Sequence, residues 1–204
     1  MIQGVIDLFP EPKEKGIAKI SNFVFKASEN QIYNMRNVRD GGWDFYVSDG
    51  HYVRLHVGKE LMMTDTPLER KSNRDFVQAA NGRVLIAGLG IGMIIKNILD
   101  KPNVAEIVVI EKYQDVIDLV SPAFTDPRIR YVCADILDYL LPRTEKFDTI
   151  YFDIWPAICT DNLEEIYLLE KKFRRNMNKL NPNRWMGSWM KKYLQKEKRK
   201  NKFY

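Results

Sequence analysis

The stretch that most constrains the fold of this chain is residues 83–92, RVLIAGLGIG. Four apolar residues are followed by glycine at every second position, and residues 93–99 then place apolar side chains at helical spacing. This pattern predicts a buried strand, a tight turn and the start of a helix. Because glycine permits positive φ and lets backbone N–H groups approach a ligand closely, we expect Gly88, Gly90 and Gly92 to form a nucleotide-binding turn.

A second apolar run, residues 106–110, ends in Glu111 about 20 residues after the glycines. A carboxylate at this point can accept hydrogen bonds from two ribose hydroxyls. Met93 stands where a dinucleotide-binding turn would have its third glycine. The spacing therefore favours an adenosine ligand that lacks a pyrophosphate over NAD or FAD.

Strands and helices alternate through the next part of the chain. We expect a helix over residues 114–120, a strand over 129–133, a short helix over 136–141 and a strand over 147–153. Such alternation predicts a parallel sheet with right-handed crossovers. A helix beginning near residue 160 and a fifth strand over 184–190 complete the predicted sheet.

Acidic residues stand at the carboxyl ends of two of the predicted strands, Asp135 after the strand over 129–133 and Asp153 at the end of the strand over 147–153. Asp135 can accept a hydrogen bond from the exocyclic amine of adenine, and Asp153 can accept a hydrogen bond or a proton from an amine or hydroxyl acceptor. Taken singly, each acid is more often a cap or turn residue. Ligands of open α/β sheets bind beyond the carboxyl ends of the strands. We therefore expect the glycines, Glu111, Asp135 and Asp153 to meet in one crevice.

Three further residues are candidates for substrate contact. Trp155 and Pro156 follow Asp153 directly and would form a wall of the acceptor site, where an indole can stack on a planar group or a cation. Trp155 fits equally well as a ring packed in the core. Asp65 precedes the predicted helix 67–80, where it is either an ordinary cap or part of a substrate pocket.

Residues 17–63 alternate short apolar runs with turn residues, which predicts an antiparallel meander of four or five strands, one of them over 43–47. His51 and His56 have no companions at metal-ligand spacing, so we expect no metal site. Because few residues of this sequence follow 190, we expect no further strand pair beyond the fifth strand. The edge this leaves would be covered by the tail or by a second subunit, which makes a homodimer a hypothesis.

With 204 residues, 45% of them hydrophobic, the chain can bury one main core and a small second one. We expect a meander over 1–64, a nucleotide-binding domain over 65–190 and a basic tail over 191–204. No run of 18 apolar residues and no signal-peptide pattern is present, so we expect a soluble, cytoplasmic protein without a membrane partner. Cys133 and Cys159 are expected to be buried small side chains.

The net charge of +5 is unevenly distributed. Thirteen of the 32 Lys and Arg residues lie in 171–204, where Glu197 is the single acid. Such a segment can neutralise nucleic-acid phosphates, or it can be a solvated chain end.

The motifs VLIAGLGIG, VVIE, CAD and YFDIWP, in this order, resemble those of class I S-adenosylmethionine-dependent transferases, and most of all the spermidine-synthase-like branch, over roughly residues 45–190. Ile86 supports that branch, because most methyltransferases have an acid there. The resemblance implies a Rossmann-like, doubly wound, mostly parallel sheet of the class I methyltransferase type, preceded by a small antiparallel β-meander. It also implies that the three glycines contact the donor's amino acid portion, Glu111 the ribose and Asp135 the adenine, with Asp153 beside the reacting amine.

Two departures bear on the reaction. Aminopropyltransferases usually have a second acid three residues after this aspartate, where this chain has Pro156, and their Tyr-His-Glu stretch is replaced by residues 71–75, KSNRD. The sequence therefore predicts a transferase that uses S-adenosylmethionine, with methyl transfer favoured. The alternatives are an aminopropyltransferase using decarboxylated S-adenosylmethionine, and a non-catalytic protein that binds an adenosine ligand or nucleic acid. No motif identifies the acceptor.

Overall fold

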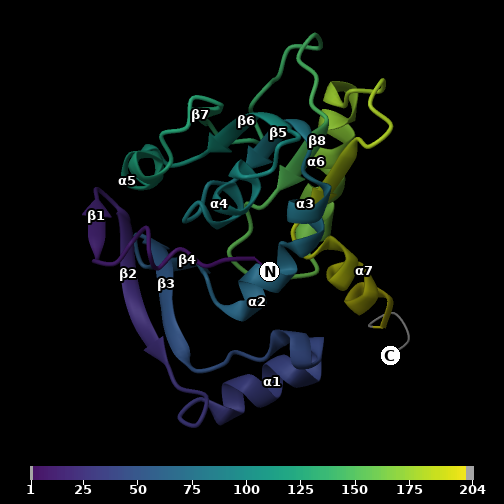
Figure 1. Cartoon of the computed structure of the whole chain (residues 1–204). Coiled ribbons are helices and arrows are strands. Elements are labelled where there is room, and N and C mark those ends of the chain that lie inside the picture. The colour runs from purple at the N-terminus through teal and green to yellow at the C-terminus, as the bar shows by residue number, and fades with distance from the viewer. Residues whose placement is uncertain (1, 201–204) are drawn as a thin grey trace.

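The computed structural model describes residues 2–200, without the side chains of residues 40, 41 and 44. It contains a five-stranded parallel sheet and a four-stranded antiparallel sheet, which lie one above the other in Figure 1. A single hydrophobic core runs through both sheets, from Val5 and Phe9 near the N-terminus to Leu194 near the C-terminus. The two sheets therefore pack on one another rather than standing apart.

The parallel sheet has the strand order β7-β6-β5-β8-β9, with every neighbouring pair parallel. Its strands are β5 (Gly82–Ala87), β6 (Val104–Glu111), β7 (Ile129–Cys133), β8 (Thr149–Phe152) and β9 (Trp185–Ser188). The strand order reverses between β5 and β8, which creates the switch point where ligands bind in doubly wound sheets. This confirms the predicted Rossmann-like fold.

Helices follow β5, β6 and β8, as the apolar periodicity predicted, but residues 134–148 between β7 and β8 contain no helix. They are α4 (Met93–Leu99), α5 (Gln114–Val120) and α6 (Asn162–Phe173), with short 3₁₀ turns η2 (Ser121–Ala123) and η3 (Arg174–Asn176). All four residues of β8 are buried, as are the last four of β5, which is typical of parallel strands covered on both faces.

The antiparallel sheet consists of β1 (Lys13–Lys15), β2 (Ala18–Phe25), β3 (Gly50–Val57) and β4 (Glu60–Thr64), paired in chain order. The predicted strand over 43–47 was wrong. Between β2 and β3 the chain forms α1 (Gln31–Gly41) and the 3₁₀ turn η1 (Trp43–Phe45). The Asn34 amide pairs with both backbone groups of Val47, at 2.8 and 2.9 Å, and so takes the place of a strand partner.

Two other predicted elements differ in the structure. The helix expected over 67–80 is divided at Asn73 into α2 (Pro67–Ser72) and α3 (Arg74–Ala79). Asn73 leaves helical geometry with φ −90° and ψ 1°, and its Oδ1 accepts a hydrogen bond from the Tyr151 hydroxyl at 2.8 Å. The helix expected over 136–141 is a turn, because the Asp135 carboxylate accepts the Leu137 N–H at 3.0 Å and closes a local loop.

The fifth predicted strand is present as β9, followed by α7 (Lys191–Lys200), so most of the expected basic tail is a helix. Residues 201–204 of that tail lie outside the described part of the chain. Cys133 and Cys159 are exposed, so the expectation of burial was wrong: the first ends the edge strand β7 and the second lies in the loop before α6. No helix within residues 2–200 combines the length and apolar character needed to cross a membrane.

Candidate functional site

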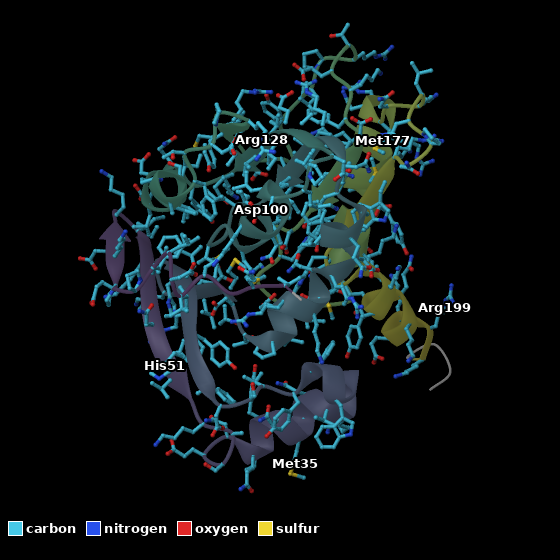
Figure 2. The ribbon with its side chains drawn as sticks, viewed as in Figure 1. Met35, His51, Asp100, Arg128, Met177 and Arg199 are labelled. Carbon is cyan, nitrogen blue, oxygen red and sulfur yellow. The ribbon has the colours of Figure 1, made fainter. Side chains whose placement is uncertain are left out.

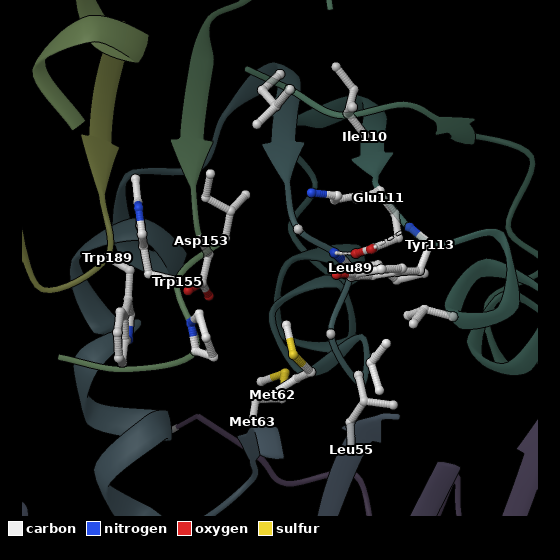
Figure 3. Close-up of a pocket in the computed structure, with 18 of the residues that line it drawn as sticks. Leu55, Met62, Met63, Leu89, Ile110, Glu111, Tyr113, Asp153, Trp155 and Trp189 are labelled. Atoms are coloured by element: carbon white, nitrogen blue, oxygen red, sulfur yellow. Dashed lines mark hydrogen bonds between the residues drawn. The ribbon is translucent and has the colours of Figure 1, made fainter. Parts of the chain in front are cut away.

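A cavity of about 330 Å³ lies at the carboxyl ends of β5, β6 and β8. The antiparallel sheet closes it from the opposite side, where Leu55 of β3 and Met62 and Met63 of β4 face the turns that follow the parallel strands (Figure 3). The volume falls within the range usual for small-molecule sites. The cavity therefore occupies the switch point that the sequence predicted.

The glycine turn joins β5 to α4, and all three glycines have positive φ, of 97°, 53° and 71° for Gly88, Gly90 and Gly92. A Cβ on Gly88 would lie 2.0 Å from the Asp153 carbonyl oxygen, so only glycine lets the ends of β5 and β8 approach so closely. Gly88 and Gly90 line the cavity. Gly92 precedes α4, packs against the Phe124 ring and is not part of the lining.

Met63 covers part of the glycine turn. Its sulfur accepts a hydrogen bond from the Ile91 N–H at 3.2 Å, and a Cβ on Gly90 would lie 2.0 Å from that sulfur. A thioether from β4 therefore occupies the place beside Gly90 where the resemblance puts the donor's amino acid portion.

Glu111 ends β6 and is held rigidly by the backbone. One carboxylate oxygen accepts the Leu89 N–H at 2.8 Å and the other accepts the Tyr113 N–H at 2.9 Å, as the dashed lines in Figure 3 show. Burial raises the pKa of the Glu111 carboxyl, although these backbone donors oppose the increase. Each oxygen keeps a lone pair for a hydroxyl group of a ligand.

Asp135 lies beyond the end of β7, also in the cavity lining. Burial alone would raise the pKa of its carboxyl, but the Leu137 N–H and the Lys112 ammonium, 3.0 Å away, lower it overall. Asp135 is therefore ionised and can accept a hydrogen bond from a base in the cavity.

Asp153 follows β8 and faces the cavity together with Glu69 from α2. Among the described side chains no hydrogen bond or ion pair engages either carboxylate, and both residues are partly buried. Burial raises the pKa of Asp153 to about 7. Burial and the adjacent Asp153 raise the pKa of Glu69 to about 8. Such values are common where acids act in binding or catalysis.

Two indoles complete this end of the cavity. Trp155 is 8% exposed and donates its Nε1–H to Glu165 at 2.8 Å, so it belongs both to the core and to the cavity wall. Trp189 follows β9 and donates to the Ser72 hydroxyl at 2.9 Å. In Figure 3 both rings lie on the Asp153 side. Pro156 is exposed and also contributes to the lining.

The structure does not bring Asp65 to the cavity lining. Its buried carboxylate accepts the backbone N–H groups of Val5 at 2.9 Å and Val53 at 2.7 Å, and Arg70 lies 3.6 Å away. Asp65 therefore ties the N-terminal segment to β3 and α2, which explains an acid at this position without a substrate.

Sequence reasoning missed several residues of the lining that carry charge, sulfur or an indole. They are Glu60, Met62, Met63, Glu69, Lys112, Glu165 and Trp189. Glu69 and Glu165 lie in the first turns of helices, where acids are common because they interact favourably with the helix dipole. Glu69 stands four residues after Asp65, but Glu165 is ten residues from Trp155 and had no comparable signal in the sequence.

The charged part of the lining consists of six acids and Lys112. Lys112 is already paired with Asp135, so the cavity is strongly acidic inside a chain of net positive charge. Among the described residues, no group of three His, Cys, Asp or Glu side chains is arranged to hold a metal ion. The cavity is suited to a cationic organic ligand.

No family model matches the chain. A polyamine aminopropyltransferase from Thermococcus onnurineus is 33% identical over 110 residues, which cover 50% of this chain and 37% of that protein. Spermidine synthase from Thermotoga maritima is 19% identical, with a TM-score of 0.45 over 79% of this chain and 52% of its own. An S-adenosylmethionine-dependent methyltransferase from Mesorhizobium loti is 17% identical, with a TM-score of 0.42 over 52% and 49%.

The similar structures are therefore spermidine synthases and S-adenosylmethionine-dependent methyltransferases, the two groups that the sequence motifs resemble. This chain spans about a third of the curated relative's length and about half of each solved structure.

Proposed function

We propose that this chain binds an S-adenosyl sulfonium compound and catalyses transfer of one of its alkyl groups to an acceptor beside Asp153. The observation that carries the proposal is that the glycine turn, Glu111 and Asp153 line one cavity at the switch point of the sheet. The neighbouring acids favour a positively charged ligand over a phosphate-bearing one.

The residues present fit the adenosine half of such a donor. The Glu111 carboxylate would accept hydrogen bonds from the ribose hydroxyls, and the Asp135 carboxylate one from the adenine amine. Apolar side chains line the space between these two acids, namely Leu89, Ile110, Val116, Ile136 and Leu137. A nucleoside combines a flat apolar base with a few hydrogen-bonding groups, and this lining has the same division.

When bound, the sulfonium supplies an electrophilic carbon with a thioether as leaving group. The chain then has to align the nucleophile and accept its proton. Asp153 is suited to this role because its pKa of about 7 lets it accept and release a proton near neutral pH. The buried indoles of Trp155 and Trp189 line the same region.

The position of Met63 bears on which alkyl group is transferred. The carboxylate of S-adenosylmethionine would need hydrogen bonds from backbone N–H groups of the glycine turn. The Ile91 N–H in that turn already donates its hydrogen bond to the Met63 sulfur. The acidic lining would also repel a carboxylate. These two features, together with the curated relative's name, favour a decarboxylated donor and hence aminopropyl transfer. Methyl transfer from S-adenosylmethionine requires Met63 to move.

Isothermal titration calorimetry tests the proposal, using S-adenosylmethionine, its decarboxylated form and 5′-methylthioadenosine as ligands. We expect micromolar binding that falls at least about tenfold in Glu111→Gln, because the ribose loses a charged acceptor. Tighter binding of the decarboxylated form supports aminopropyl transfer, and tighter binding of S-adenosylmethionine supports methyl transfer. If none of the three binds the wild type, the proposal is wrong.

A second candidate function rests on α7, where four cationic residues share one helix face; Figure 2 labels one of them, Arg199. Lys192, Lys196, Arg199 and Lys200 line a shallow groove on that face with Gln195. Lys192 also pairs with Asp75, and Lys200 with Glu197. We propose that this stripe binds nucleic-acid phosphates. Fluorescence anisotropy with a single-stranded oligonucleotide should show steeply salt-dependent binding that Lys196→Glu with Arg199→Glu removes and Lys59→Glu, on the β3–β4 turn, does not. Equal affinity in all three proteins would refute it.

A further inference from the structure

The indole of Trp43 lies on the surface, far from the cavity, and 77% of the residue is exposed. It belongs to η1, the short turn after α1, and its ring lies beside that of Tyr46, with ring centroids 5.9 Å apart. The Trp43 Nε1–H has no hydrogen-bond acceptor among the described residues. Because tryptophan is highly buried on average in folded proteins, an indole this exposed contributes little to the core and is available to a ligand.

The turn that carries Trp43 packs against the basic helix α7. The Phe45 ring of η1 lies 5.5 Å from the Tyr193 ring of α7, measured between centroids. Figure 1 shows α7 beside the end of α1 from which η1 follows. Tyr193 directly follows Lys192, one of the cations that line the groove on α7. The exposed indole and the cationic groove therefore lie on neighbouring segments of one surface.

The cations of this groove are available to an anion. Lys196 and Arg199 are exposed, and within residues 2–200 their side chains have no ion-pair partner. Lys192 pairs with Asp75, but 88% of the lysine side chain is exposed, and an ion pair so open to solvent is weak. A row of positive charges along a groove suits a chain of phosphates.

A row of cations beside an exposed aromatic ring is the combination that binds single-stranded nucleic acid without sequence preference. In a duplex the bases stack on one another, whereas an unpaired base presents its face to an aromatic side chain. A lipid surface is broad and flat, and it fits cations that line a groove less well.

We propose that α7 and η1 together bind a single-stranded nucleic acid, with its phosphates along the groove of α7 and a base stacked on the Trp43 indole. This inference rests on the nucleic-acid binding proposed above and specifies the ligand as a strand with unpaired bases. The two contacts differ in kind, because the phosphate contacts weaken as salt increases and the stacking contact does not depend on charge.

Fluorescence anisotropy with the full chain tests this division, using three labelled ligands of equal length. They are an oligothymidylate, an abasic strand with the same number of phosphates, and a duplex. We compare the wild type with Trp43→Ala, Trp43→Phe and the double variant Lys196→Gln with Arg199→Gln, each over a series of salt concentrations. The control is Leu180→Ala, which removes another highly exposed apolar side chain, 93% exposed, from the loop before β9.

We expect the wild type and Leu180→Ala to bind the oligothymidylate more tightly than the abasic strand or the duplex. Trp43→Ala should bind the oligothymidylate about 5- to 100-fold more weakly, and no more tightly than the abasic strand, with an unchanged salt dependence. Trp43→Phe should keep part of the preference because it keeps an aromatic ring. The double variant should reduce the slope of log affinity against log salt by about 1.4, since it removes two phosphate contacts.

Equal affinity of the wild type for the oligothymidylate and the abasic strand would overturn the inference, as would equally tight binding of the duplex or wild-type affinity in Trp43→Ala. If the double variant still weakens binding in these cases, the proposed binding of phosphates stands. If no oligonucleotide binds, both proposals fail. Vesicles of phosphatidylserine form a separate arm, and vesicle binding that Trp43→Ala weakens, without any preference for the strand that carries bases, would assign this surface to a membrane and refute the inference.

Discussion

Asp153 should make the stability of this protein fall as pH rises through the neutral range. Its pKa is about 7 in the folded chain against 3.8 for an unperturbed carboxyl, because burial disfavours the charged form. Between these two values the folded state retains a proton that the unfolded state has released. The free energy of unfolding therefore decreases with rising pH across this window and stops decreasing above pH 7.

The size of the effect follows from the shift. One pKa unit corresponds to about 1.4 kcal/mol, so the full shift sets an upper limit of about 4 kcal/mol. Asp153 keeps some surface exposed to the cavity, where water can solvate its charge. We therefore expect about 1–2 kcal/mol, the scale of interactions at an intermediate effective dielectric constant.

Asp153→Asn removes this penalty because an amide does not ionise. The variant should exceed the wild type in stability by about 1–2 kcal/mol at pH 8, and this gain should be absent at pH 4.5. Urea unfolding followed by circular dichroism at the two pH values measures the difference, with Glu164→Gln as the control at an exposed acid. A difference between variant and wild type that does not change with pH would refute the reasoning, as would a variant that is less stable at pH 8.

Three further perturbations test other parts of the account. Gly88→Ala should unfold the chain or lower its stability by more than about 2 kcal/mol, measured by thermal unfolding, because the new Cβ would meet the Asp153 carbonyl oxygen at φ 97°. Met63→Ala should raise the affinity for S-adenosylmethionine more than that for its decarboxylated form in calorimetry; an equal change for both would contradict the role given to the sulfur. Asp126→Asn should destabilise the chain at pH 7, because Arg128 lowers the pKa of Asp126 to about 2 in the folded state. The difference in unfolding free energy between variant and wild type should vanish as pH falls toward about 2. A difference that persists in acid unfolding curves would count against this pairing.

The parallel sheet could be predicted because its signals are local and strong. One uninterrupted apolar run ends in the glycine turn at Gly88 and the next ends in Glu111. Parallel strands have their carboxyl ends at the same edge of the sheet, independent of the conformation of the loops. The predictions failed where a single side chain redirects the backbone. The Asn34 amide holds Val47, and the Asp135 carboxylate closes the turn expected to be a helix.

The candidate site was only partly predictable for a related reason. Asp135 and Asp153 follow strands, so the positions of those strands in the sheet determine where the two carboxylates lie. Glu69 and Glu165 come from helices whose orientation depends on tertiary packing, and in sequence they look like ordinary acids of a first helical turn. Met63 comes from the antiparallel sheet, and no local sequence pattern predicts that its sulfur contacts the glycine turn.

A crystal structure of the chain with 5′-methylthioadenosine tests the central claim most directly. We expect the ribose hydroxyls to lie within hydrogen-bonding distance of Glu111, the adenine amine to contact Asp135 and the sulfur to point toward Asp153. A nucleoside bound in another orientation or at another place on the molecule would contradict it.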